Sequence, residues 1–176
     1  MKKKGKIILT VVLVLAIAAV AAAVAAFRPQ PVLDPSGTYE VQRVNYWLEG
    51  PNLEWEGYLH TMPTPEQAQE ILALLEGYEK QLSTDRLPQR LFLNLLPAQF
   101  QSMEVQLPEW LEAAIFIWDP ENQDDYFNLI LGNGHVQIRD GYTYLPPYYE
   151  ISNGQQLYQE LDAILHLDQR MAALRD

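Results

Sequence analysis

Cysteine is absent from this 176-residue chain, and several other reactive residue types are scarce. Without cysteine the fold cannot contain a disulfide, thiol catalysis is excluded, and no side chain can carry the lipid of a bacterial lipoprotein. Only four serines occur, and none lies in a G-x-S-x-G nucleophile elbow. No Asn-x-Ser/Thr sequon is present, so no N-linked glycan is expected.

Basic residues are scarce after the first 27 positions. From Arg28 onward the chain has 8 basic and 23 acidic residues, a net charge of −15. Such a surface repels nucleic acids and anionic lipid headgroups, so neither is expected as a partner of this part of the chain. Cationic partners are compatible with it, but the simplest interpretation is a soluble, self-avoiding surface.

The sequence predicts no metal or cofactor site. The three histidines, His60, His135 and His166, are far apart and form no H-x-H or H-E-x-x-H pattern. The segment Asp119–Asp125 gathers oxygen ligands of the kind that calcium binds. It lacks the register and the central glycine of an EF-hand, so we interpret it as a polar hairpin loop and leave calcium binding open.

One long apolar run dominates the N-terminal part of the chain. Residues 7–27 contain Thr10 as their only polar member, and a helix of that length spans roughly the 30 Å of a bilayer's hydrocarbon core. Four lysines precede the run and favour a cytoplasmic N-terminus. We therefore predict a cytoplasmic tail at 1–6, a transmembrane anchor at 7–27, a Pro-rich tether at 28–37 and an extracytoplasmic domain at 38–176.

The same run can be interpreted as a cleavable secretory signal. Its second half, Ala18–Ala26, is rich in small residues and offers A-x-A-like cleavage sites, for example at Ala21–Ala23. The length of the run, and the Arg28-Pro29 pair that follows it, favour an uncleaved anchor. Cleavage would instead release a secreted soluble domain.

The domain begins with a predicted strand pair and a helix. Thr38–Leu48 and Leu53–His60 alternate apolar and polar residues, as half-buried strands do. Thr64-Pro65-Glu66-Gln67 has the form of a capping box with proline at the first helical position. The helix should continue along an apolar face and end near 81–85.

The rest of the domain reads mainly as strands followed by one helix. We expect strands at Arg90–Leu96, Ala113–Trp118, Tyr126–Leu131, His135–Arg139, Tyr142–Leu145 and Tyr148–Ile151, and a second capping box, at Ser152 and Gln155, that starts the last helix. This order of elements predicts an α+β fold: a single domain with a mostly antiparallel sheet and two main helices packed on it.

The layout resembles a group of bacterial domains. The membrane signal, the tether, the strand pair, the "Thr-Pro-Glu-Gln…Ile-Leu" helix and the "Gly-Asn-Gly…Tyr-Tyr-Glu-Ile…Leu-Tyr…Leu" segment are similar to small uncharacterised extracytoplasmic domains of Gram-positive bacteria. Many of those domains are lipoproteins, and this chain departs from them by lacking the lipidated cysteine. The resemblance implies a fold and a location, and no activity.

Aromatic residues supply the first candidate binding surface. Within eight residues the chain places four tyrosines and two prolines, and the tyrosines are Tyr142, Tyr144, Tyr148 and Tyr149. Exposed tyrosine rings suit contact with sugars or peptides. Aromatic packing along a sheet is the competing interpretation.

An acidic strand face supplies the second candidate. Glu54 and Glu56 share one face of the second strand with His60 beyond them, and paired carboxylates are the groups that glycosidases use. An exposed hairpin face has the same pattern. We therefore expect a non-catalytic binding or protein-interaction module of the cell envelope, with an unknown protein or cell-wall partner. The alternative is a hydrolase acting on cell-wall glycan or peptide.

Overall fold

A computed structural model describes residues 2–49, 55–83, 112–122, 126–141 and 148–175. These residues form an eight-stranded antiparallel sheet with the strand order β1-β4-β8-β7-β6-β5-β2-β3. In chain order the elements are α1 (Lys2–Ala26), β1 (Gln30–Pro31), β2 (Glu40–Glu49), β3 (Trp55–Thr61), α2 (Pro65–Leu75), β4 (Glu79–Leu82), β5 (Ala113–Trp118), β6 (Tyr126–Gly132), β7 (His135–Asp140), β8 (Tyr148–Ile151), α4 (Gly154–Leu165) and α5 (Leu167–Arg175). The predicted α+β class is confirmed.

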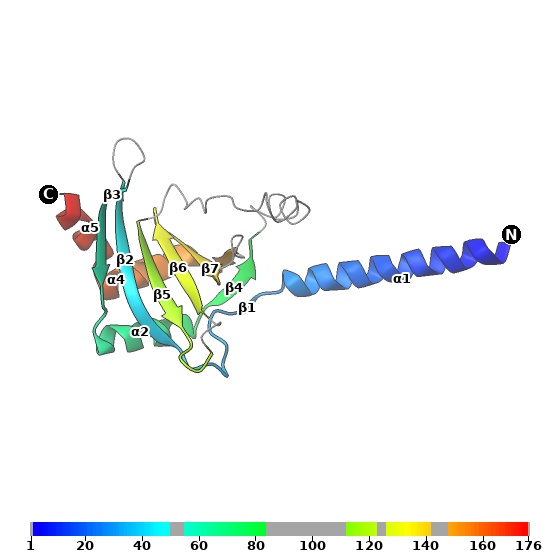
Figure 1. The fold of residues 1–176 in the computed structure, drawn as a ribbon, viewed down its shortest axis with the longest axis horizontal. Helices are drawn as coiled ribbons and strands as arrows, with labels where there is room; N and C mark the ends of the chain where they lie inside the picture. Colours follow the sequence, from blue (N-terminus) through cyan, green and yellow to red (C-terminus); the bar gives the residue numbers. More distant parts are fainter. Residues whose placement is uncertain (1, 50–54, 84–111, 123–125, 142–147, 176) are drawn as a thin grey trace.

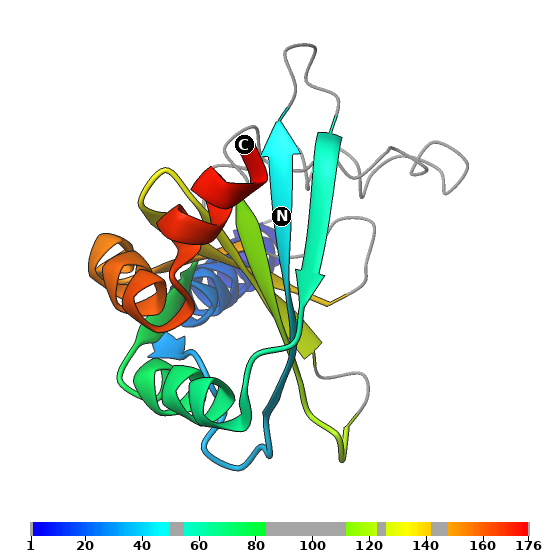
Figure 2. The same ribbon diagram turned by 90° about the vertical axis from the view of Figure 1, so that its left-hand side faces the viewer.

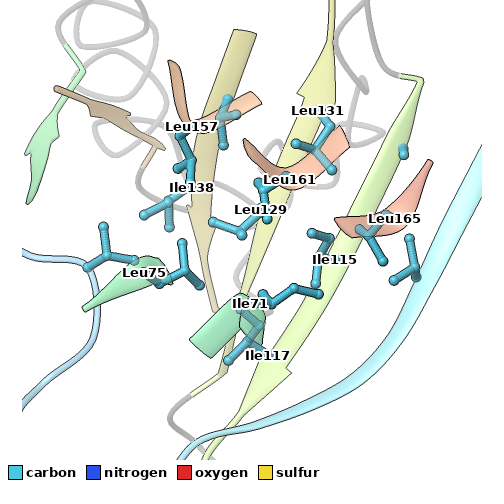
Figure 3. Close-up of a cluster of buried hydrophobic side chains, with 14 of the residues drawn as sticks. Ile71, Leu75, Ile115, Ile117, Leu129, Leu131, Ile138, Leu157, Leu161 and Leu165 are labelled. Carbon is cyan, nitrogen blue, oxygen red and sulfur yellow. The ribbon is translucent and has the colours of Figure 1, made fainter. Parts of the chain in front are cut away.

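Helices α2, α4 and α5 lie on the same side of the sheet (Figure 2). The hydrophobic core fills the layer between them, and Figure 3 shows aliphatic side chains from the helices meeting those of the central strands. Side chains alternate between the faces of a strand, so every second residue of β5 and β6 enters this core. The labelled members of the core are Ile71, Leu75, Ile115, Ile117, Leu129, Leu131, Ile138, Leu157, Leu161 and Leu165, all at most 2 % exposed.

The middle of the sheet follows the predicted strand limits closely. β5 occupies the predicted residues, and β6 and β7 are each one residue longer than expected. The tight turn between β6 and β7 has positive φ at Asn133 (49°) and Gly134 (72°), as a type I′ hairpin requires. The predicted strands Arg90–Leu96 and Tyr142–Leu145 lie outside the described residues.

Helix α2 starts as predicted and ends earlier. The Thr64 hydroxyl accepts from the Gln67 backbone N–H at 3.2 Å, and the Gln67 side chain accepts from the Thr64 N–H at 3.1 Å. The helix stops at Leu75, and Glu79–Leu82 form β4. The expected helix end near 81–85 was wrong because β4 pairs with β1 and β8, partners that local periodicity cannot reveal.

Part of the predicted tether belongs to the folded domain. Gln30 and Pro31 pair with β4 as an edge strand. Val32 and Leu33 are 1 % and 8 % exposed, and the Val32 N–H donates to the Tyr78 carbonyl at 3.1 Å. Burial of these two side chains extends the domain to the N-terminal side of the expected start near Thr38.

The C-terminal helix differs from the prediction at its start and is divided into two helices. Asn153 is the N-cap residue in a left-handed conformation (φ 61°), with no side-chain capping bond, while the Ser152 N–H donates to the Glu79 carbonyl. The second predicted capping box was therefore wrong. His166 (φ 54°) divides the expected single helix into α4 and α5, and Leu165 and Leu167 on either side of it are both buried.

Helix α1 extends away from the sheet and its covering helices (Figure 1). Its side chains from Thr10 to Ala25 are all exposed, with exposed fractions from 52 % at Val11 to 66 % at Val24 among the large apolar residues. Among the described residues, no helix has both the length and the apolarity needed to cross a membrane.

The two predicted capping boxes give a matched test of the fold. We expect Thr64→Ala to lower the free energy of unfolding by about 1 kcal/mol, because it removes a side-chain acceptor from the first turn of α2. Ser152→Ala should change it by less than about 0.5 kcal/mol, because only the Ser152 backbone makes a described bond. Urea unfolding of both variants measures the two values. Equal losses would contradict the observed start of α4.

Candidate functional site

A row of mostly polar and aromatic residues crosses the face of the sheet opposite the helices. Cross-strand pairing aligns Arg43 of β2 with Phe116, Phe116 with Asn128, Asn128 with Arg139, and Arg139 with Tyr148 of β8. Directly paired residues project to the same face of a sheet, so these five side chains form one continuous row. We call it the outer row.

The outer row contains polar atoms that lack partners. The Asn128 side chain is 4 % exposed, and its Oδ1 atom has no hydrogen bond. The Nε atoms of Arg43 and Arg139 are buried and also make no hydrogen bond. Buried polar groups are normally hydrogen-bonded, and an unmade bond costs about 1–3 kcal/mol. Three unmade bonds in one row therefore mark a place where a ligand could supply them.

An aromatic ring positions one of the two arginines. The Arg43 guanidinium carbon lies 4.3 Å from the centroid of the Phe116 ring, within cation–π distance. Phe116 stands between Arg43 and Asn128 in the register of the sheet. The stacking therefore orients the guanidinium along the row instead of leaving it free to rotate into solvent.

A second row on the same face flanks the first. Asn45 is 3 % exposed, and its Oδ1 lies 3.1 Å from His60 Nδ1. Ala114 and Ile130 continue this row as a small buried apolar cluster, with Trp47 and Phe116 packed against it. The outer row is thus bounded on one side by an Asn–His pair and an apolar patch.

The structure distributes the predicted tyrosines between the two faces. Tyr148 is buried at the end of the outer row, and Tyr149 points to the helix side, where it packs against the core. Lys80 Nζ lies 5.3 Å from the Tyr149 ring centroid. Tyr142 and Tyr144 lie outside the described residues.

The predicted acidic face is only partly described. Glu54 lies outside the described residues, and Glu56 belongs to β3, with its side chain also outside them. His60 is exposed on the same face as the outer row, opposite Asn45. Of the predicted site residues, therefore, His60 and Tyr148 are the two that the described structure brings to this face.

Sequence reasoning missed Arg43, Asn128 and Arg139. A signal for one of them was present, because Asn128 interrupts the apolar segment Tyr126–Leu131. A polar side chain in a buried strand costs free energy unless it forms a hydrogen bond. That the three would align could not be predicted, because alignment depends on the register of four strands.

A hollow of about 680 Å³ lies on the other side of the molecule, between the end of α2 and the start of α4. In it the Tyr78 hydroxyl donates to Glu160 Oε2 at 2.8 Å, and Gln156 Nε2 donates to Glu160 Oε1 at 2.9 Å. The bonds from Gln156 and Tyr78 lower the pKa of Glu160. Burial, followed by the nearby Glu160 carboxylate, raises the pKa of Tyr78 to about 12.

The described residues of the hollow and of the Asp119 loop form no candidate metal centre. Over the described part of the chain, no group of three or more histidine and acidic residues could hold a metal ion. Asp119 is 6 % exposed, with Oδ1 accepting from the Glu121 N–H and Oδ2 from the Thr38 N–H. These bonds give Asp119 a role in shaping the loop. The question of calcium binding, which the sequence leaves open, falls partly on residues 123–125, which lie outside the described residues.

Comparisons with family models, with curated proteins and with solved structures found no match to this chain. The interpretation of the site therefore depends on its own geometry.

The Tyr78–Glu160 pair predicts behaviour at high pH. Because the pKa of Tyr78 is raised from about 10 to about 12 on folding, its contribution to stability is complete below pH 10 and is lost as the pH rises through 12. Ultraviolet titration of the folded protein should show that Tyr78 ionises near pH 12, and Tyr78→Phe should remove its contribution to the absorbance change there. Glu160→Gln should move it to lower pH, and an unchanged titration curve in both variants would contradict the assignment.

Proposed function

We propose that this chain is a membrane-anchored extracytoplasmic domain of the bacterial cell envelope, and that it acts as a non-catalytic binding module. The outer row is the observation that carries the binding part of the proposal. It combines two arginines, a buried asparagine and aromatic rings on a rigid antiparallel sheet. Hydrogen-bonding groups on a rigid support that still lack partners are suited to recognition, because little conformational entropy is lost when a ligand binds.

The location rests on the sequence. Four lysines followed by the 21-residue apolar run at 7–27 favour an N-terminus in the cytoplasm and a domain outside it. In this proposal α1 holds the domain close to the outer surface of the membrane. The binding partner of the domain is then a component of the cell envelope.

A sedimentation assay tests the binding function. Full-length protein in detergent micelles should cosediment with insoluble bacterial cell-wall material and release no soluble wall fragments. Arg139→Gln should reduce cosedimentation by about tenfold, the effect of one charge-assisted hydrogen bond. Arg170→Gln is the matched control, because Arg170 lies on the helix side against the Tyr46 ring. Release of soluble fragments would instead favour the hydrolase.

Whether the N-terminal segment is retained or cleaved tests the proposed membrane anchor. We expect mass spectrometry of the membrane fraction to detect peptides from Met1 to Lys6 still joined to the chain, because the 21-residue run at 7–27 exceeds the roughly 7–15 residues of a signal-peptide core. A mature N-terminus between Ala22 and Phe27, together with protein in the culture medium, would show cleavage and contradict the anchor.

A further inference from the structure

The two arginines of the outer row stand on either side of a buried polar atom. Arg43 and Arg139 are three strands apart, about 14 Å between their backbones at the usual strand spacing. Asn128 and Phe116 occupy the strands between them, and the Arg43 guanidinium lies over the Phe116 ring. The register therefore places a guanidinium-bearing side chain on each side of the unbonded Asn128 Oδ1.

Glu150 and Glu40 are two carboxylates that could neutralise the arginines of the outer row. On the same face, the Glu150 carboxylate belongs to the neighbouring row and accepts from the Ser83 hydroxyl at 2.9 Å. Glu40 is exposed at the start of β2. The Nε atoms of both arginines are buried and have no hydrogen-bond acceptor. A partly buried guanidinium of this kind is stabilised when an anion enters.

The unbonded atoms of the two arginines and Asn128 also indicate which chemical groups the anion must contain. A guanidinium presents N–H donors in a planar fork that matches an oxyanion. Asn128 Oδ1 accepts hydrogen bonds and would repel a bare anion, so the ligand must bring a donor beside its acidic group. The surrounding net charge of −15 disfavours multiply charged phosphates more than a single carboxylate.

We propose that the outer row binds a small organic carboxylate bearing a hydroxyl or N–H group next to the acid, such as a sugar acid. Arg43 and Arg139 donate to the carboxylate oxygens, and Asn128 Oδ1 accepts from the neighbouring hydroxyl or N–H. This assignment rests on the proposed binding function, because it names the ligand class of that same site.

Arginine side-chain NMR signals test the proposal directly. The full-length, ¹⁵N-labelled chain in detergent micelles is titrated with glucuronate, with glucose as the neutral analogue and with inorganic phosphate. Glucuronate should shift the Nε–H signals of Arg43 and Arg139, which are assigned from Arg43→Lys and Arg139→Lys, and glucose should shift neither. The Arg170 signal is the internal control and should stay in place.

Substitutions then separate binding from folding. Arg43→Gln and Arg139→Gln should each weaken glucuronate binding by about tenfold or more. Arg43→Lys keeps the charge but loses the planar fork, and it should also bind more weakly while its melting curve stays close to that of the parent protein. A lysine variant that binds as tightly as the parent would contradict recognition through the guanidinium fork.

The outcomes also distinguish this proposal from the binding function itself. If the protein cosediments with wall material while millimolar glucuronate neither shifts the two signals nor competes, the ligand class is wrong and the binding function stands. A response to phosphate alone would overturn the carboxylate assignment in the same way. If the protein does not cosediment but glucuronate shifts both signals, the site is supported and the wall partner is wrong.

Discussion

The burial of one face of the sheet by α2 and α4 is the constraint on which the rest of the structure depends. Leu157, Leu161 and Leu165 of α4 and Ile71 and Leu75 of α2 pack onto alternate residues of the central strands. Each buried aliphatic side chain contributes about 1.5–3 kcal/mol, so this layer dominates the stability of a domain without disulfides. Because strand side chains alternate, the same packing fixes which residues point to the opposite face.

On the opposite face, buried polar groups without hydrogen bonds lower the stability of the folded state. Asn128 sits between core residues of β6, with its oxygen buried and unbonded, and two arginines hold buried nitrogens without acceptors. Apolar side chains at these positions would pack into a sheet at lower cost. Polar groups retained at such a cost are more easily explained by recognition than by stability, and this contrast connects the architecture to the proposed binding site.

Local signals in the sequence predicted much of the architecture. The capping box at Thr64, the Asn133-Gly134 turn and the limits of the β5–β8 strands all depend on residues within a few positions of one another. Predictions failed where a distant partner decided the outcome. β4 forms because it pairs with β8, and β1 forms because it pairs with β4. Helix α4 starts at a left-handed Asn153, in a segment whose Ser152 backbone is bonded to Glu79.

The sequence by itself determined the α+β class, the acidic surface, the absence of thiol chemistry and the apolar N-terminal run, since each follows from composition or short-range periodicity. The tertiary structure alone decided that Arg43, Asn128, Arg139 and Tyr148 share one row, and that Tyr149 turns toward the core. The physical reason is register. A shift of one residue in any of the central strands would exchange its two faces. The register depends on how strands from different parts of the chain pair, so no single segment of the sequence determines it.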